Sequence, residues 1–313
     1  MPLYLYQSND LSLLASRFRD ETGRAPLSPM EKETVLVQSI GMGRWLSLSM
    51  AESFGVWANF RYIYPNVLLD TAFRAAFDDY RPEKLVSKSE MTWQIYDVLP
   101  SLAVNKIFAP LKGYAEDESS LKRFQLAGKI ADLFDQYLTS RPDMIRAWDA
   151  NTNALVAGEY TRDLEDDERW QSELWRMISR KKKNEHRAYY RERLANEGFS
   201  LFAMEKLPPR LSVFGVSTLF PFHLDILEAL AAHIDVRMYV LSPSSEYIAD
   251  ILPGKVRAKT ARRLASFGKS VEDEHIARGH ALIGSFGSLA RDFQGVLLSR
   301  EIKDMTSDDD FSS

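Results

Sequence analysis

Short apolar runs alternate with helical patterns at both ends of this chain, and that alternation leaves few folds open to it. Residues 3–8 form a short apolar run, and a helical pattern follows them after a capping residue, Asp10. Residues 34–37 and 45–54 repeat this order, and residues 208–243 restore it as strand, helix, strand. Because helices between consecutive strands favour parallel pairing, the sequence predicts an α/β fold with a parallel sheet covered by helices.

The details of the turns and of the chain's last third follow from the same pattern. A third apolar run at residues 58–65 precedes a helical run at residues 67–77. We expect Gly41 and Gly43 to loosen the turn before the second helix. Residues 281–298 predict one more helix, and the acidic, serine-rich residues after it are typical of a fraying tail.

The middle of the chain has a different pattern, in which helical periodicity dominates and strand-like runs are few. The helical stretches are residues 88–103, 122–140, 167–180 and 185–196. We therefore predict a discontinuous α/β domain, residues 1–80 and 198–313, with a large all-helical subdomain, residues 81–197, inserted into it.

Composition narrows the class of protein and the kinds of partner. The 313 residues are 45% hydrophobic and carry a formal net charge of -4, so any nucleic-acid site must be a local patch. The chain has no cysteine, which excludes disulfides and thiolate metal sites and fits a reducing compartment such as the cytoplasm. No uncharged stretch approaches the roughly 20 residues of a membrane span, so we expect no membrane partner.

The usual catalytic motifs are missing, so the sequence predicts no catalytic, cofactor-binding or metal-binding residues. The first strand-to-helix turn, residues 7–12, has neither the glycines nor the lysine of a phosphate loop. The second turn has a lone G-x-G at Gly41 and Gly43. The five histidines contain no H-E-x-x-H, and Leu219 replaces the last glycine that a nucleophile elbow around Ser217 would need.

Residues 124–143 contain an amphipathic helix whose solvent face is richer in acid than solubility requires. Its core face consists of Phe124, Ala127, Ile130, Leu133, Phe134, Tyr137 and Leu138. The opposite stripe contains Asp132, Asp135 and Gln136, and Pro142 ends the helix at Arg141. Two carboxylates on one helix can share a divalent ion. Without further ligands, however, such carboxylates usually only keep the exposed face of the helix solvated.

A basic segment at residues 180–193 is the best nucleic-acid candidate by composition. Cations such as Arg187 alternate there with His186 and two tyrosines. The cations could bind phosphates, and the rings could stack on bases. The alternative is a solvated helix face, and composition alone favours that alternative.

Several segments, in order along nearly the whole chain, resemble the N-terminal portion of the RecC family, the gamma chains of exodeoxyribonuclease V. The matching segments are residues 35–46, 54–59, 91–93, 129–143, 169–175, 186–188, 214–217 and 285–292. The family protein is several times longer, so the chain resembles an N-terminal fragment. The resemblance implies a superfamily 1 helicase-like domain that has lost its nucleotide-binding motifs and carries an inserted helical subdomain.

The resemblance also implies a set of DNA-binding residues in a channel that reads sequence. These residues are Asp132, Leu133, Asp135, Gln136, Arg141 and Arg187. Carboxylates accept hydrogen bonds from exocyclic base amines, and arginine binds guanine edges through two hydrogen bonds, so acid in such a channel favours base reading. A tryptophan of the family's channel is replaced by Asp70, so the recognised sequence can differ.

The leading hypothesis is therefore a noncatalytic DNA-binding and sequence-recognition subunit of a recombination and repair nuclease, with Chi-type scanning. The resemblance implies single-stranded DNA from an unwound duplex end, a RecB-like helicase-nuclease and a RecD-like second helicase as partners. Two alternatives stay open: an active ATP-dependent helicase or nuclease domain, and a protein-interaction scaffold that touches no DNA.

Overall fold

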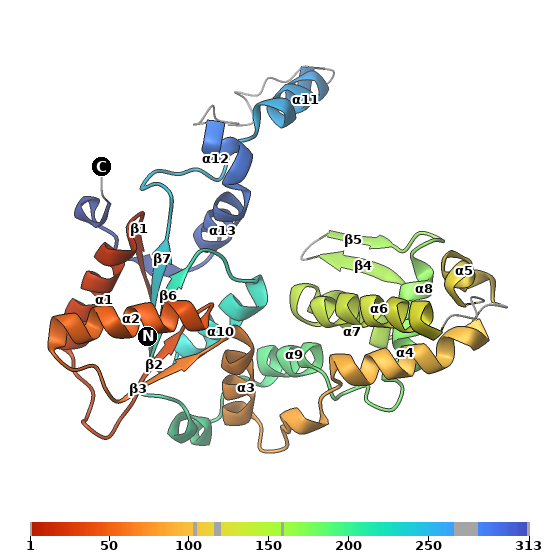
Figure 1. Ribbon diagram of the computed structural model, residues 1–313, viewed down its shortest axis with the longest axis horizontal. Helices are drawn as coiled ribbons and strands as arrows, with labels where there is room; N and C mark the ends of the chain where they lie inside the picture. Colours follow the sequence, from red (N-terminus) through yellow and green to blue (C-terminus); the bar gives the residue numbers. More distant parts are fainter. Residues whose placement is uncertain (1, 103–104, 116–119, 158–159, 266–280, 312–313) are drawn as a thin grey trace. The chain divides into compact units, whose positions relative to one another are not determined.

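The computed structural model describes residues 2–102, 105–115, 120–157, 160–265 and 281–311. The chain divides into two units (Figure 1). Unit 1 combines the two ends of the chain, Met1–Ala75 and Leu201–Ser313, and unit 2 is the continuous stretch Ala76–Ser200.

Unit 1 is built on a six-stranded sheet in the order β3-β2-β6-β7-β1-β8, and every neighbouring pair is parallel. The strands are β1 Leu3–Ser8, β2 Glu33–Leu36, β3 Phe60–Ile63, β6 Arg210–Val216, β7 Asp235–Leu241 and β8 Ile302–Asp304. The predicted α/β class with a largely parallel central sheet is confirmed.

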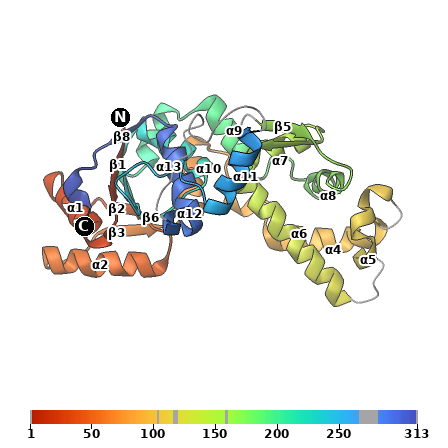
Figure 2. The same cartoon turned by 90° about the horizontal axis from the view of Figure 1, so that it is seen from above.

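Helices cover this sheet, and the core lies between the two layers (Figure 2). The helices of unit 1 are α1 Leu11–Arg24, α2 Ile40–Phe54, α3 Pro65–Ala76, α10 Pro221–Ala231, α11 Gly254–Ala265, α12 Ala281–Phe286 and α13 Ser288–Leu298, of which α11 stands away from the sheet (Figure 1). Phe18 of α1 contacts Phe214 of β6 and Tyr239 of β7 at ring-centroid distances of 5.8 and 5.4 Å, and all three side chains are fully buried. Asp10 caps α1 as predicted, because its carboxylate accepts a hydrogen bond from the Ser12 backbone amide.

Three local predictions in unit 1 were wrong. Gly41 and Gly43 lie inside α2 and not in a turn; a Cβ at Gly43 would lie 3.1 Å from the Tyr62 ring, so close packing explains this glycine. The expected helix at residues 281–298 is divided into α12 and α13 at Gly287. The expected tail, residues 304–313, begins with the last residue of β8, Asp304, which pairs with Leu5 of β1, and the Thr306 hydroxyl accepts a hydrogen bond from the Gln7 amide.

Unit 2 is mostly helical, but the all-helical prediction was wrong because the unit contains a β-hairpin. Its helices are α4 Lys88–Leu102, α5 Lys112–Ala115, α6 Ser120–Ser140, α7 Pro142–Asp149, α8 Arg169–Ser179 and α9 Arg187–Glu197. Strands β4 Ala154–Ala157 and β5 Tyr160–Asp163 pair antiparallel. The core is centred on Phe134, whose ring contacts those of Trp148 and Trp175 edge to face.

Candidate nucleic-acid interface

Helix α6 carries most of the residues that the sequence singles out. Its buried side consists of Ala127, Ile130, Ala131, Phe134 and Leu138. Gln136 is exposed, whereas Asp132, Leu133 and Asp135 are half-buried at the edge of the packed face. Leu133 therefore lies on the flank of the helix, between the core and the two carboxylates.

Arg141 lies between α6 and α7, where Pro142 begins the second helix. Its side chain is exposed, and its guanidinium carbon lies 5.9 Å from the centroid of the Tyr137 ring. Among the described residues no hydrogen bond or ion pair joins Arg141 to Asp132, Asp135 or Arg187. The structure thus places Arg141 at the end of α6 but does not bring it into contact with the other predicted residues.

Arg187 and Asp135, in contrast, come together from different helices. Arg187 is the first residue of α9, and its Nη1 lies 3.9 Å from Oδ1 of Asp135. The side chains are 23% and 44% exposed, so both are accessible to a ligand. The Nε atom of Arg187 is buried and has no hydrogen-bond partner, which leaves one strong donor of the guanidinium unused.

Asp132 has a cationic partner that the sequence did not reveal. Lys88, the first residue of α4, forms an ion pair with Oδ1 of Asp132. Its hydrogen bond and charge interaction with Asp132, with a smaller contribution from Asp135, raise the pKa of the Lys88 ammonium group. No sequence pattern pointed to Lys88, because its pairing arises from the packing of α4 against α6.

These four side chains form what we call the charged strip: Lys88, Asp132, Asp135 and Arg187. Each carboxylate pairs with one cation, Asp132 with Lys88 and Asp135 with Arg187, and all four side chains are at least partly exposed. Exposed ion pairs of this kind contribute only about 0–1 kcal/mol each. A ligand that offers both donors and acceptors can therefore replace them at little cost, and the edges of nucleobases have this character.

A buried polar network fixes the start of α9, and with it the position of Arg187. His186 caps the helix, because its Nδ1 accepts a hydrogen bond from the Tyr189 amide at 3.2 Å. The other ring nitrogen, Nε2, therefore carries the proton and donates to Asp149 of α7 at 3.0 Å. The Trp175 indole of α8 donates to the same carboxylate at 2.9 Å. Three helices are thus joined at one buried carboxylate.

The basic segment at residues 180–193 is not the exposed basic and aromatic stripe that composition allowed. His186 and Tyr190 are only 1% and 7% exposed, because they pack inside unit 2. Ion pairs occupy several cations: Lys182 with Glu90, Arg191 with Asp143 and Arg193 with Asp79. The segment therefore largely supports the packing of unit 2, whereas Arg187 faces the carboxylates of α6.

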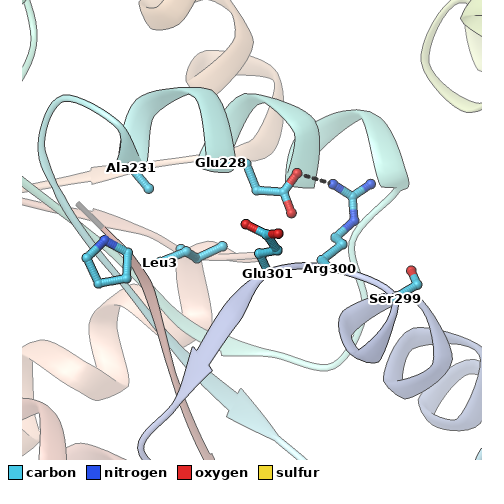
Figure 3. Close-up of a pocket in the computed structure, with 7 residues that line it drawn as sticks. Leu3, Glu228, Ala231, Ser299, Arg300 and Glu301 are labelled. Carbon is cyan, nitrogen blue, oxygen red and sulfur yellow. Dashed lines mark hydrogen bonds and ion pairs between the residues drawn. The ribbon is translucent and has the colours of Figure 1, made fainter.

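In unit 1, a cavity of about 550 Å³ lies near the amino ends of β1 and β8 (Figure 3). Leu3 and Ala231 line it together with Arg300, whose guanidinium donates to Glu228 at 2.6 Å and Asp225 at 2.8 Å. Open α/β sheets bind ligands beyond the carboxyl ends of their strands, not at the amino ends. This cavity is therefore a poor nucleotide site, and its arginine already has two carboxylate partners.

At the carboxyl end of β1, the start of α1 is occupied by the protein's own acid. Oδ1 of Asp10 accepts from the Ser12 amide at 2.6 Å, and the Asp10 amide donates to the Ser8 hydroxyl at 3.0 Å. A phosphate at this helix start would meet the Asp10 carboxylate, which repels it. This geometry explains in physical terms why the first turn is a poor phosphate site.

Two kinds of feature are absent from the described part of the chain. No three histidine or acidic side chains gather there in a way that could bind a metal ion. No helix there is both long and apolar enough to cross a bilayer.

Comparison with known proteins gives a consistent result along the whole chain. The family model described as RecC, N-terminal domain, matches residues 3–312. The RecBCD enzyme subunit RecC of Escherichia coli K12 is 31% identical over 316 residues, which cover 93% of this chain and 28% of that protein. The RecBCD enzyme subunit RecC of Haemophilus influenzae is 26% identical over 343 residues, or 95% of this chain and 30% of that protein. The chain thus spans less than a third of the length of these relatives.

Proposed function

This chain belongs to the RecC N-terminal domain family, and we propose that it is a noncatalytic DNA-binding and sequence-recognition part of an exodeoxyribonuclease V complex. In this proposal it scans single-stranded DNA from an unwound duplex end for a Chi-type sequence during double-strand break repair and homologous recombination. Its partners are a RecB-like helicase-nuclease and a RecD-like second helicase, and its compartment is the cytoplasm. The names of the relatives, each a RecBCD enzyme subunit, support the complex.

The proposal includes a superfamily 1 helicase-like α/β domain that has no phosphate loop. Its boundaries would be residues 1–80 and 198–313, with residues 81–197 as the inserted subdomain. The parallel sheet of unit 1 and the contiguous unit 2 support this organisation. The Asp10 carboxylate at the start of α1 supports the loss of nucleotide binding, because it lies where a phosphate would need positive charge.

One observation carries the reading role: Asp135 and Arg187 meet from two helices, and both side chains are partly exposed. An arginine of this kind binds guanine O6 and N7 through two hydrogen bonds, and a carboxylate accepts from the exocyclic amine of cytosine. We assign the same role to Asp132 and Gln136 on α6 and place Arg141 at the end of the reading surface. Leu133 would contact a base through its apolar surface.

The test is sequence-dependent regulation by the complete complex carrying Asp135→Ala or Arg187→Ala. Each variant removes one base contact of roughly 1–3 kcal/mol, so the preference for the regulatory sequence should fall about 5- to 150-fold while unwinding continues. Asp166→Ala and Arg180→Ala are matched controls, because both residues are exposed in unit 2 outside the charged strip. Unchanged regulation in both strip variants would contradict the reading role and favour the scaffold alternative.

The enzyme alternative has a separate test. A helicase with its own nucleotide site binds ATP saturably, so radiolabelled ATP titrated against this 313-residue chain distinguishes the two cases. We expect no saturable binding at micromolar ATP. Saturation in that range would exclude the noncatalytic proposal.

A further inference from the structure

Unit 2 exposes a pair of large aromatic rings on the helices that also carry the charged strip. Trp93 of α4 and Phe124 of α6 are 55% and 40% exposed, and their ring centroids lie 5.2 Å apart. Tyr96 supports both rings from the side, at 5.8 and 6.2 Å. Phe124 was expected on the core face, but the first turns of α6 leave it at the surface against Trp93. Exposed aromatic rings gathered in this way mark binding sites more often than random surface.

A cation, Arg123, lies at the edge of this aromatic pair. The guanidinium carbon of Arg123 lies 4.3 Å from the centroid of the Tyr96 ring, and Nη2 donates to the Tyr96 hydroxyl at 2.7 Å. Among the described residues no carboxylate pairs with Arg123, and its buried Nε has no hydrogen-bond partner. The aromatic pair therefore has beside it a positive charge that pairs with no acid in the described part of the chain, which suits a ligand that carries phosphate.

The aromatic pair is continuous with the charged strip along α4 and α6. Lys88 contacts Asp132 near the start of α4, and Trp93 contacts Phe124 further along the same antiparallel pair (Figure 1). Phe124 and Asp135 are eleven residues apart, which is about three helical turns, so they lie on the same side of α6. The rise between them is about 16 Å, enough for up to about five nucleotides at the roughly 3.4 Å spacing of stacked bases.

We propose that Trp93 and Phe124 form a stacking platform for an unpaired nucleobase of single-stranded DNA, beside the strip that contacts base edges. Flat aromatic faces accept any base, and each base–aromatic stack strengthens binding without selecting a sequence. Phosphates of the same strand would lie on the Arg123 side, away from Asp97, which is exposed one turn beyond Trp93.

This inference rests on the proposed function only in requiring that single-stranded DNA passes unit 2, and it is tested by a different measurement. The probe is an oligothymidine tail carrying 5-iodouracil on a duplex end, bound to the complete complex. Trp93→Ala should lower affinity for the tail about 5- to 150-fold, the effect of losing one stack, and Trp93→Phe should retain most of it. Irradiation of the wild-type complex should cross-link the tail to Trp93 or Phe124.

Leu121→Ala is the matched control, because Leu121 is 63% exposed on the same helix but offers no ring. We expect its affinity and cross-linking to equal those of the wild type. A Trp93→Ala affinity within twofold of wild type, with no cross-link on α4 or α6, would overturn the platform. Loss of complex assembly in both Trp93→Ala and Leu121→Ala would overturn it as well, because this face would then contact protein.

The two proposals can fail separately. Trp93→Ala should weaken binding to every sequence and preserve the ratio between regulatory and other sequences, whereas Asp135→Ala should lower that ratio. If only the ratio responds, the platform is wrong and the reading role stands. If only the overall affinity responds, the platform stands and the reading role is wrong.

Discussion

The buried carboxylate of Asp149 should be the most sensitive single group in unit 2. Its side chain is 1% exposed and accepts hydrogen bonds from Trp175, His186 and Arg146 at 2.9, 3.0 and 3.0 Å. Asp149→Ala removes all three acceptor contacts at once. Arg146 keeps a second partner, because its Nε donates to Glu192 at 2.7 Å. The Trp175 and His186 N–H groups, in contrast, are buried and would have no acceptor.

The expected loss of stability follows from these two orphaned donors. A buried donor without an acceptor costs about 1–3 kcal/mol, so two of them cost about 2–6 kcal/mol. Breaking a buried charged network by removing one partner typically costs about 3–5 kcal/mol, which agrees with that range. We therefore expect Asp149→Ala to lower the free energy of unfolding by about 4 kcal/mol. Asp149→Asn keeps one acceptor oxygen and should lose less.

The assay is equilibrium unfolding in urea, followed by tryptophan fluorescence and far-UV circular dichroism, with coincident transitions checked first. Asp143→Ala is the matched control on the same helix, because Asp143 is 48% exposed and pairs with Arg191 at the surface. Such a pair contributes about 0–1 kcal/mol. Equal losses in Asp149→Ala and Asp143→Ala would refute the argument that the buried network holds α7, α8 and α9 together.

Two further predictions concern other parts of the chain. Arg162 donates to both carboxylate oxygens of Glu168 and lowers the pKa of that carboxyl from 4.5 to about 2. The contribution of Glu168 to stability should therefore be complete above pH 4.5 and decline as the pH falls towards 2. The urea midpoints of the wild type and of Glu168→Gln should therefore differ less at pH 3 than at pH 6. Gly215 has a φ of +65°, and a Cβ there would lie 2.8 Å from Met42 Sδ, so Gly215→Ala should cost roughly 1–3 kcal/mol. Gly55→Ala, at φ +77° with open space, serves as its control because only the strain without the clash applies.

The sequence alone was enough to predict those parts of the fold that local residue patterns determine. The i, i+3, i+4 spacing placed Ile130, Phe134 and Leu138 in the core and Asp135 at the rim, because a helix of 3.6 residues per turn has only one way to bury them. The parallel sheet followed from alternation in the same way. The β-hairpin of unit 2 escaped prediction because its second strand, Tyr160–Asp163, is polar and largely exposed, so no apolar run marks it in the sequence.

The sequence was insufficient where a tertiary partner decides the role of a residue. His186 lies in a basic run that suggests a surface, yet it is buried because Asp149 and the Tyr189 amide satisfy both ring nitrogens. Lys88 had no distinguishing neighbours in sequence, and only the packing of α4 on α6 brings it to Asp132. Gly43 was interpreted as a turn residue, whereas the nearby Tyr62 ring explains it.

The charge balance of the charged strip affects how this chain, which is acidic overall, could recognise a DNA sequence. Two cations and two carboxylates make the strip formally neutral, so it has little attraction for phosphate, and in the proposed reading role it would have to bind base edges. Opening one surface ion pair costs about 0–1 kcal/mol, whereas one correct base contact with two hydrogen bonds gains about 1–3 kcal/mol. A wrong base would form no such hydrogen bonds, so the ion pair of the strip would form again. Under the proposed function the net discrimination would therefore be about tenfold per position, and ion pairs that re-form between bases would let the strand continue to move.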